Sequence, residues 1–167
     1  NHLGGFRVMI TGKGGVGKTS LTALLSRLLA RDGRRVLALD ADPQMNLPYA
    51  IGLPVAEARE LVPISQNRAY VQVMVMGTTV QPAAGCLCPE NTLLAGVVEA
   101  MNLRQDEVIL MDTQAGFEHF GRALAKGFHH AVVVCDPTFN AVQVAIHAAR
   151  LAREMGIPAR SEEHTSE

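Results

Sequence analysis

Gly12-Lys13-Gly14-Gly15-Val16-Gly17-Lys18-Thr19 matches the phosphate-binding pattern G-x-x-x-x-G-K-[ST] at every fixed position. Glycines in such a loop let the backbone turn N–H groups toward phosphates, Lys18 adds positive charge at the β- and γ-phosphates, and the Thr19 hydroxyl suits Mg²⁺. A strand is expected from Phe6 to Ile10 and a helix from Ser20 to Arg31, with Gly33 ending the helix. Together they predict a P-loop that binds a nucleoside triphosphate with magnesium.

Further apolar runs alternate with helical patterns along the chain. Strands are expected at 35–40, 70–76, 107–112 and 131–136, and helices at 56–61, 90–101, 117–127 and 140–155. This alternation predicts an α/β P-loop NTPase fold, with a doubly wound, mainly parallel sheet and helices on both faces. Asp112 ends a buried strand, and such sheets bind ligands at that end. We therefore expect Asp112 to bind Mg²⁺ beside Thr19, directly or through water.

Composition narrows the function classes. The chain has 167 residues, 48 % hydrophobic and 19 % charged, with a formal net charge of −1, which predicts one α/β domain and gives no reason to expect nucleic-acid binding. No apolar run approaches the roughly 18 residues of a membrane span, and no signal peptide is recognisable. We expect a cytoplasmic protein without a membrane partner, whose three cysteines are thiols or metal ligands.

Both ends of the chain look non-native. The sequence opens on Asn1, and residues 160–167 break the α/β pattern abruptly. We interpret 160–167 as a sequencing or cloning artefact, with a genuine polar tail as the alternative. The ATPase domain would then span 1–159 and be incomplete at its C-terminus.

Cys86 and Cys88 form a Cys-x-Cys pair in an expected loop. Two thiolates are too few for a closed four-thiolate site, but a two-fold dimer would bring two such pairs together. Thiolates suit Zn²⁺ or Ni²⁺. Two unconnected buried cysteines are the alternative. Cys135 is expected to be a small core residue, and the adjacent His129 and His130 are expected in a solvated loop.

The segment from Lys13 to Thr19 resembles the deviant Walker A motif K-G-G-x-G-K-T. The family that carries it includes the ParA/MinD partitioning ATPases, the nitrogenase iron protein and metallocentre maturation ATPases. The resemblance implies a nucleotide-dependent homodimer in which Lys13 crosses to the partner's phosphates, as an arginine finger does. A solvated loop lysine is the alternative.

The same resemblance places Asp42 at the first switch, where it would orient the attacking water, and Gly116 in the second switch, where its N–H would reach the γ-phosphate. An ordinary turn role is the alternative for both, and Asp40 is expected to orient its loop. The implied catalytic residues are Lys13, Lys18 and Asp42. The implied nucleotide contacts are Gly12, Lys13, Gly14, Gly15, Val16, Gly17, Lys18, Thr19, Ser20, Asp112 and Gly116.

Three segments resemble the carbon monoxide dehydrogenase maturation factors, the CooC-type ATPases implicated in nickel insertion. These segments are 85–91, 115–122 and 135–138, and the resemblance covers about residues 6–158. It implies that Cys86 and Cys88 bind Ni²⁺ or Zn²⁺ across the dimer. A signature of this family is matched by Glu118, His119 and Arg122. Its residues could serve an interface or a helix cap as readily as catalysis. The resemblance predicts an acidic or an apolar residue near position 114, and Gln114 is neither.

The combined interpretation is an ATP-hydrolysing dimeric metallochaperone whose client is a carbon monoxide dehydrogenase. A partitioning or positioning ATPase of the ParA/MinD type is the alternative. It would share the P-loop and both acids, and it would need a basic face for DNA or an amphipathic membrane helix. An electron-transfer ATPase like the nitrogenase iron protein ranks third, because that class uses widely separated cysteines and Cys86 and Cys88 are two apart.

Overall fold

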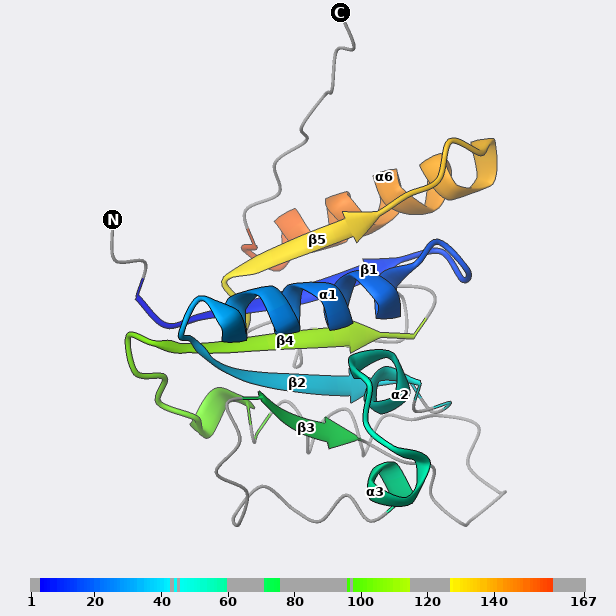
Figure 1. Ribbon diagram of the computed structural model, residues 1–167. Helices are drawn as coiled ribbons and strands as arrows, with labels where there is room; N and C mark the ends of the chain where they lie inside the picture. The colour runs from blue at the N-terminus through cyan, green and yellow to red at the C-terminus, as the bar shows by residue number, and fades with distance from the viewer. Residues whose placement is uncertain are drawn as a thin grey trace, which may run out of the picture.

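The computed structural model describes residues 4–42, 44, 46–59, 71–75, 96, 98–114 and 127–157 (Figure 1). Every strand in this part of the chain belongs to one sheet. The elements are β1 (Phe6–Gly12), α1 (Lys18–Arg31), β2 (Arg35–Ala41), α2 (Leu47–Ile51), α3 (Val55–Arg59), β3 (Val71–Val75), β4 (Glu107–Thr113), β5 (His130–Val134) and α6 (Phe139–Glu154).

The sheet has the strand order β3-β2-β4-β1-β5, and every neighbouring pair is parallel. Parallel pairing puts the carboxyl ends of all the strands at one edge, where β1 leads into the P-loop. The register sets Asp40 beside Asp112 and Gly12 beside Val134 at that edge. The sheet therefore gathers residues from four separate parts of the chain beside the P-loop.

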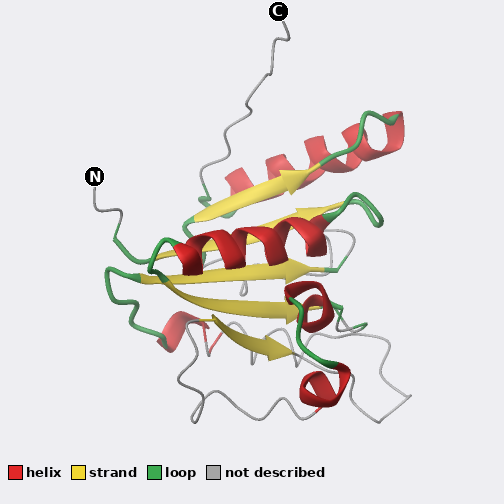
Figure 2. Ribbon diagram, viewed as in Figure 1, coloured by secondary structure: helices red, strands yellow, loops and turns green. Residues whose placement is uncertain are grey.

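Helices cover both faces of the sheet (Figure 2). On one face the strands present Val8, Ile10, Val36, Val108 and Leu110, and Leu21, Leu25 and Leu29 of α1 pack against this cluster. On the other face Met9, Leu37, Leu39, Ile109 and Met111 pack with Ala148 and Ala152 of α6. Successive residues of a strand belong to opposite apolar clusters because their side chains point to opposite faces of the sheet. The predicted fold class, with a parallel sheet buried on both sides, is confirmed.

The end of α1 agrees with the glycine predicted there. Gly33 has φ 83°, a left-handed conformation, and its N–H donates to the Ala30 carbonyl at 3.1 Å. The Arg34 N–H donates to the Leu29 carbonyl at 3.0 Å. This pair of bonds is the Schellman arrangement, which satisfies the last carbonyls of the helix.

β5 differs from its predicted span of 131–136, because it begins at His130 and ends at Val134. Cys135 therefore lies outside the strand and is an exposed free thiol, so its predicted place in the core is wrong. Most of the predicted helix 90–101, all but Gly127 of the predicted helix 117–127, and the segment 160–167 lie outside the described residues. In the part of the chain that the structure describes, no helix is long and apolar enough to cross a membrane.

Candidate functional site

The P-loop connects the end of β1 to the first turn of α1, and its glycines have the backbone conformations that it requires. Gly15 (φ 81°) and Gly17 (φ 92°) are left-handed, and Gly17 is the N-cap of α1. Gly12 (φ 146°) lies so close to β5 that an added Cβ would be 2.1 Å from the Val134 carbonyl oxygen. A side chain at position 12 would therefore push the P-loop away from the sheet.

Lys18 is buried at the start of α1, with 8 % of its surface exposed. Its Nζ donates to the Lys13 carbonyl oxygen at 3.0 Å, which joins the two lysines of the loop. Burial lowers the pKa of Lys18, while the charges of Asp112 and Asp42 oppose this shift. The ammonium thus bonds to the P-loop backbone and is influenced by the charges of two carboxylates, the setting expected for a phosphate-binding lysine.

Asp112 is buried, with 1 % of its surface exposed, and its charge acts on Lys18. The Thr19 hydroxyl, at the start of α1, favours the charged form of the Asp112 carboxylate. Burial, with the charges of Asp40 and Asp42 adding to it, raises the pKa of Asp112 to about 6, while Thr19 and Lys18 act in the opposite direction. Asp112 Oδ1 has no hydrogen-bond partner among the described residues. A buried carboxylate oxygen without a donor indicates a missing cation or donor.

Asp40 and Asp42 have different roles at the end of β2. Asp40 is buried, and its two oxygens accept from the N–H groups of Asp42 at 3.0 Å and Leu47 at 2.9 Å, so it orients the loop as predicted. Burial raises the pKa of Asp40. Asp42 is half-buried, and its Oδ1 accepts from the Gln44 N–H at 2.9 Å. That bond makes Asp42 a turn acid in this structure, although its charge still acts on Lys18 and Asp112.

Several predicted residues lie outside the part of the chain that the structure describes: Cys86, Cys88, Gly116, Glu118, His119 and Arg122. Their predicted roles are untested. Among the described residues no group of three or more His, Cys, Asp and Glu side chains is arranged to hold a metal ion.

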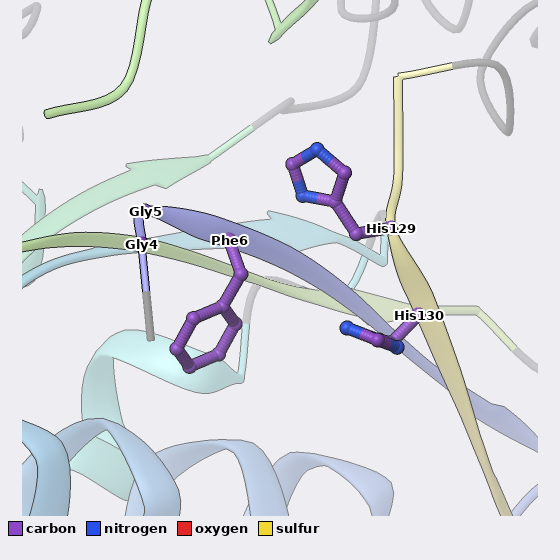
Figure 3. A pocket seen from close by; sticks show the side chains of 5 residues that line it. All are labelled: Gly4, Gly5, Phe6, His129 and His130. Atoms are coloured by element: carbon purple, nitrogen blue, oxygen red, sulfur yellow. The ribbon is translucent and has the colours of Figure 1, made fainter. Parts of the chain in front are cut away.

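His129 is an exposed residue of the loop before β5, as predicted, whereas His130 is exposed but begins the strand. The Nδ1 of His129 accepts from the Arg7 N–H at 3.0 Å, and its own N–H donates to the Arg7 carbonyl at 3.0 Å, which fixes the start of β5 to β1. His129 and His130 line a cavity of about 450 Å³ together with Gly4, Gly5 and Phe6 (Figure 3). This cavity lies at the amino ends of the strands, at the opposite edge from the P-loop.

The connection from β5 to α6 borders the P-loop, a position that sequence reasoning did not foresee although it singled out residues 135–138. Thr138 Oγ1 accepts from the Ala141 N–H at 3.4 Å and caps α6, and Asp136 Oδ1 accepts from the Thr138 N–H at 3.2 Å. The Cys135 thiol donates to the Asp136 carbonyl at 3.0 Å. The sequence holds a signal for this feature, since Asp-Pro-Thr before a helical pattern is typical of a helix start.

Comparison with known proteins agrees with this geometry. Residues 8–126 match the family model described as the CobQ/CobB/MinD/ParA nucleotide binding domain. The chain belongs to this family. It is therefore a nucleotide-binding protein of the P-loop ATPase class that includes MinD, ParA and CooC.

Individual members of the family resemble it along most of its length. The carbon monoxide dehydrogenase accessory protein CooC of Rhodospirillum rubrum is 32 % identical and aligns with 90 % of this chain and 70 % of its own. The septum site-determining protein MinD of Bacillus subtilis is 32 % identical over 83 % of this chain and 55 % of its own. The structure of MinD from Pyrococcus horikoshii with Mg-ADP has a TM-score of 0.67 at 22 % identity, covers 92 % of this chain and 67 % of its own, and shares the fold.

Proposed function

We propose that this protein is an ATP-hydrolysing, dimeric metallochaperone that binds Ni²⁺ or Zn²⁺ through Cys86 and Cys88 and assists nickel insertion into carbon monoxide dehydrogenase. The observation that carries the proposal is the 32 % identity to a carbon monoxide dehydrogenase accessory protein. The Cys-x-Cys pair in the same chain agrees with it, because a partitioning ATPase has no evident need for two neighbouring thiols.

ATP with Mg²⁺ is the proposed ligand of the P-loop. The residues from Gly12 to Ser20 would surround the phosphates with backbone N–H groups, and Lys18 would exchange the Lys13 carbonyl for phosphate oxygens. Thr19 and Asp112 fit Mg²⁺, because both offer oxygen ligands near Lys18 and Asp112 Oδ1 has no partner among the described residues. Mg²⁺, when bound, neutralises charge that develops on the β- and γ-phosphates.

Hydrolysis would use one group from each side of a dimer. Asp42 lies at the end of β2 near Lys18, where its carboxylate would accept a hydrogen bond from the attacking water. Lys13 of the partner would place its ammonium on the γ-phosphate as the bond to ADP breaks. Gly116 would add a backbone N–H to the same phosphate.

The metal ion is the cargo in this proposal. One protomer supplies two thiolates, and a two-fold dimer would supply four, enough for a tetrahedral or square-planar site. Closure by ATP would assemble this site and hydrolysis would open it. The coupling is reciprocal, so metal binding must also strengthen ATP binding.

A ParA/MinD-type positioning ATPase is the second candidate, and the identity to MinD of Bacillus subtilis favours it. It would use the same P-loop and the same nucleotide-dependent dimer, but it would bind no metal at Cys86 and Cys88. Metal binding at Cys86 and Cys88 is therefore a property that distinguishes the two candidates.

Metal titration of the purified protein separates them. Nickel and zinc are each added with and without ATP, and bound metal is counted against protomers. The proposal predicts one ion per two protomers, tighter with ATP, and loss of binding in Cys86→Ser/Cys88→Ser. Cys135→Ser is the matched control, because it removes the exposed third thiol and should leave binding unchanged. Binding that survives the double substitution, or no binding at all, would contradict the proposal.

A further inference from the structure

Lys13 and Asp136 follow neighbouring strands at the same edge of the sheet. β1 and β5 are parallel with Gly12 beside Val134, so the segments after the two strands begin at the same edge of the sheet (Figure 1). The backbones are in close contact there, since a Cβ on Gly12 would lie 2.1 Å from the Val134 carbonyl oxygen. The first side chain of the P-loop is therefore next to the β5–α6 connection.

The Asp136 carboxylate is held in place by that connection. Its Oδ1 accepts from the Thr138 N–H at 3.2 Å and from Thr138 Oγ1 at 2.5 Å, and Thr138 in turn caps α6. Pro137 restricts the backbone of the residue before it to extended conformations. Asp136 is thus a fixed negative charge anchored to the first turn of a 16-residue helix.

The fixed carboxylate acts on the lysine of the neighbouring loop. The pKa of Asp136 is lowered, chiefly by the hydrogen bonds from Thr138 and further by the charge of Lys13. Lys13 is half-buried, and its carbonyl accepts from Lys18 Nζ at 3.0 Å. Lys18 therefore holds the backbone of Lys13, and the charge of Asp136 is near enough to act on its side chain.

We propose that Asp136 is a positioning residue for Lys13, holding the ammonium over the carboxyl edge of the sheet, where a second protomer's nucleotide would meet it. The inference rests on the proposed function, which gives Lys13 its role across the dimer. Without this counter-charge, the long lysine side chain would be drawn toward phosphates in its own P-loop and would spend less time in the productive orientation.

The test is ATP hydrolysis by Asp136→Asn. Asparagine keeps an oxygen that accepts from Thr138 and removes only the charge, so the cap of α6 is preserved. We expect kcat to fall about tenfold while the KM for Mg·ATP stays within about twofold, because Lys18, Thr19 and Asp112 are intact. Asp136→Glu should recover most of the rate. The control is Asp106→Asn, which removes an exposed carboxylate paired with Arg35 and should hydrolyse ATP at the wild-type rate.

A Lys13→Ala background separates positioning from a structural role. If Asp136 acts through Lys13, adding Asp136→Asn to Lys13→Ala will lower kcat no further. Two results would overturn this inference and leave the proposed function standing. One is an equal loss of kcat on adding Asp136→Asn to the wild type and to Lys13→Ala. The other is a wild-type rate in Asp136→Asn while Lys13→Ala is inactive. A wild-type rate in Lys13→Ala would overturn the trans role of Lys13 and this inference with it.

Discussion

Asp112 is a carboxyl group that folding buries and that the proposed magnesium site needs in its charged form. Its pKa of about 6 reflects burial first and the nearby acids Asp40 and Asp42 second. At neutral pH the buried charge of Asp112 therefore lowers the free energy of unfolding, as is common for functional residues in closed sites.

Asp112→Asn should make the nucleotide-free protein more stable and less active. Removing the buried charge while keeping an oxygen for Thr19 should raise the free energy of unfolding by about 1 kcal/mol at pH 7.5. Urea unfolding measures this change, and Asp106→Asn, which alters an exposed carboxylate, should leave the free energy of unfolding nearly unchanged. Under the proposed function Mg²⁺-dependent hydrolysis should fall about 100-fold or more. A variant less stable than the wild type would contradict this reading of Asp112.

Stability should also depend on pH through Asp112. Its pKa is raised from 3.8 to about 6, so the folded protein binds more protons than the unfolded chain between these values. The contribution of Asp112 is therefore most favourable below about pH 4 and is lost as pH rises through 6, by on the order of 2 kcal/mol. Unfolding measured from pH 4 to 7 should show this loss in the wild type relative to Asp112→Asn. Parallel pH profiles for the two proteins would refute the assignment.

Sequence reasoning located Asp112 because an acid ends an apolar strand, and it assigned Asp40 to the loop correctly. It did not foresee that Asp40 and Asp112 would lie side by side, because that depends on β2 and β4 being neighbours. The local sequence pattern of a strand does not determine which strands are its neighbours in the sheet. For the same reason the effect of these acids on one another's pKa could not be predicted.

At the scale of elements, the contact between β1 and β5 sets the position of the P-loop. Gly12→Ala should destabilise the protein by about 3 kcal/mol, since its Cβ would meet the Val134 backbone and its φ of 146° disfavours a side chain. Gly15→Ala is the matched control. It has φ 81° with no atom within 4 Å of the added Cβ, so only the backbone strain of about 1 kcal/mol applies. Equal losses on urea unfolding would show that the contact with β5 does not matter.

The early end of β5 explains what sequence reasoning missed in this region. The apolar run of residues 132–135 favoured a strand through Cys135, but pairing with β1 stops at Val134, where β1 ends at Gly12. Partner length, not local hydrophobicity, ends the strand and exposes the thiol. The bonds between His129 and Arg7 likewise depend on two segments more than 100 residues apart.

At the scale of the whole molecule, the fold followed from the sequence because its signals are strong and agree with one another. The P-loop, the apolar strands and the helical spacing each indicate an α/β domain, and the sheet with helices on both faces confirms it. The proposed working unit is larger than one chain. Lys13 in trans and four thiolates around one ion are properties of a pair, so no single-chain pattern fixes their geometry.

Solution mass in different nucleotide states tests the existence of this pair most directly. Light scattering is measured with Mg·ADP and with Mg²⁺ and a non-hydrolysable ATP analogue, for the wild type and for Lys13→Ala. The proposed mechanism predicts twice the protomer mass for the wild type with the analogue, a single protomer with ADP, and a weaker dimer in Lys13→Ala. If the wild type with bound analogue has the mass of one protomer, at protein concentrations at which it binds metal, the proposed nucleotide-dependent dimer is contradicted.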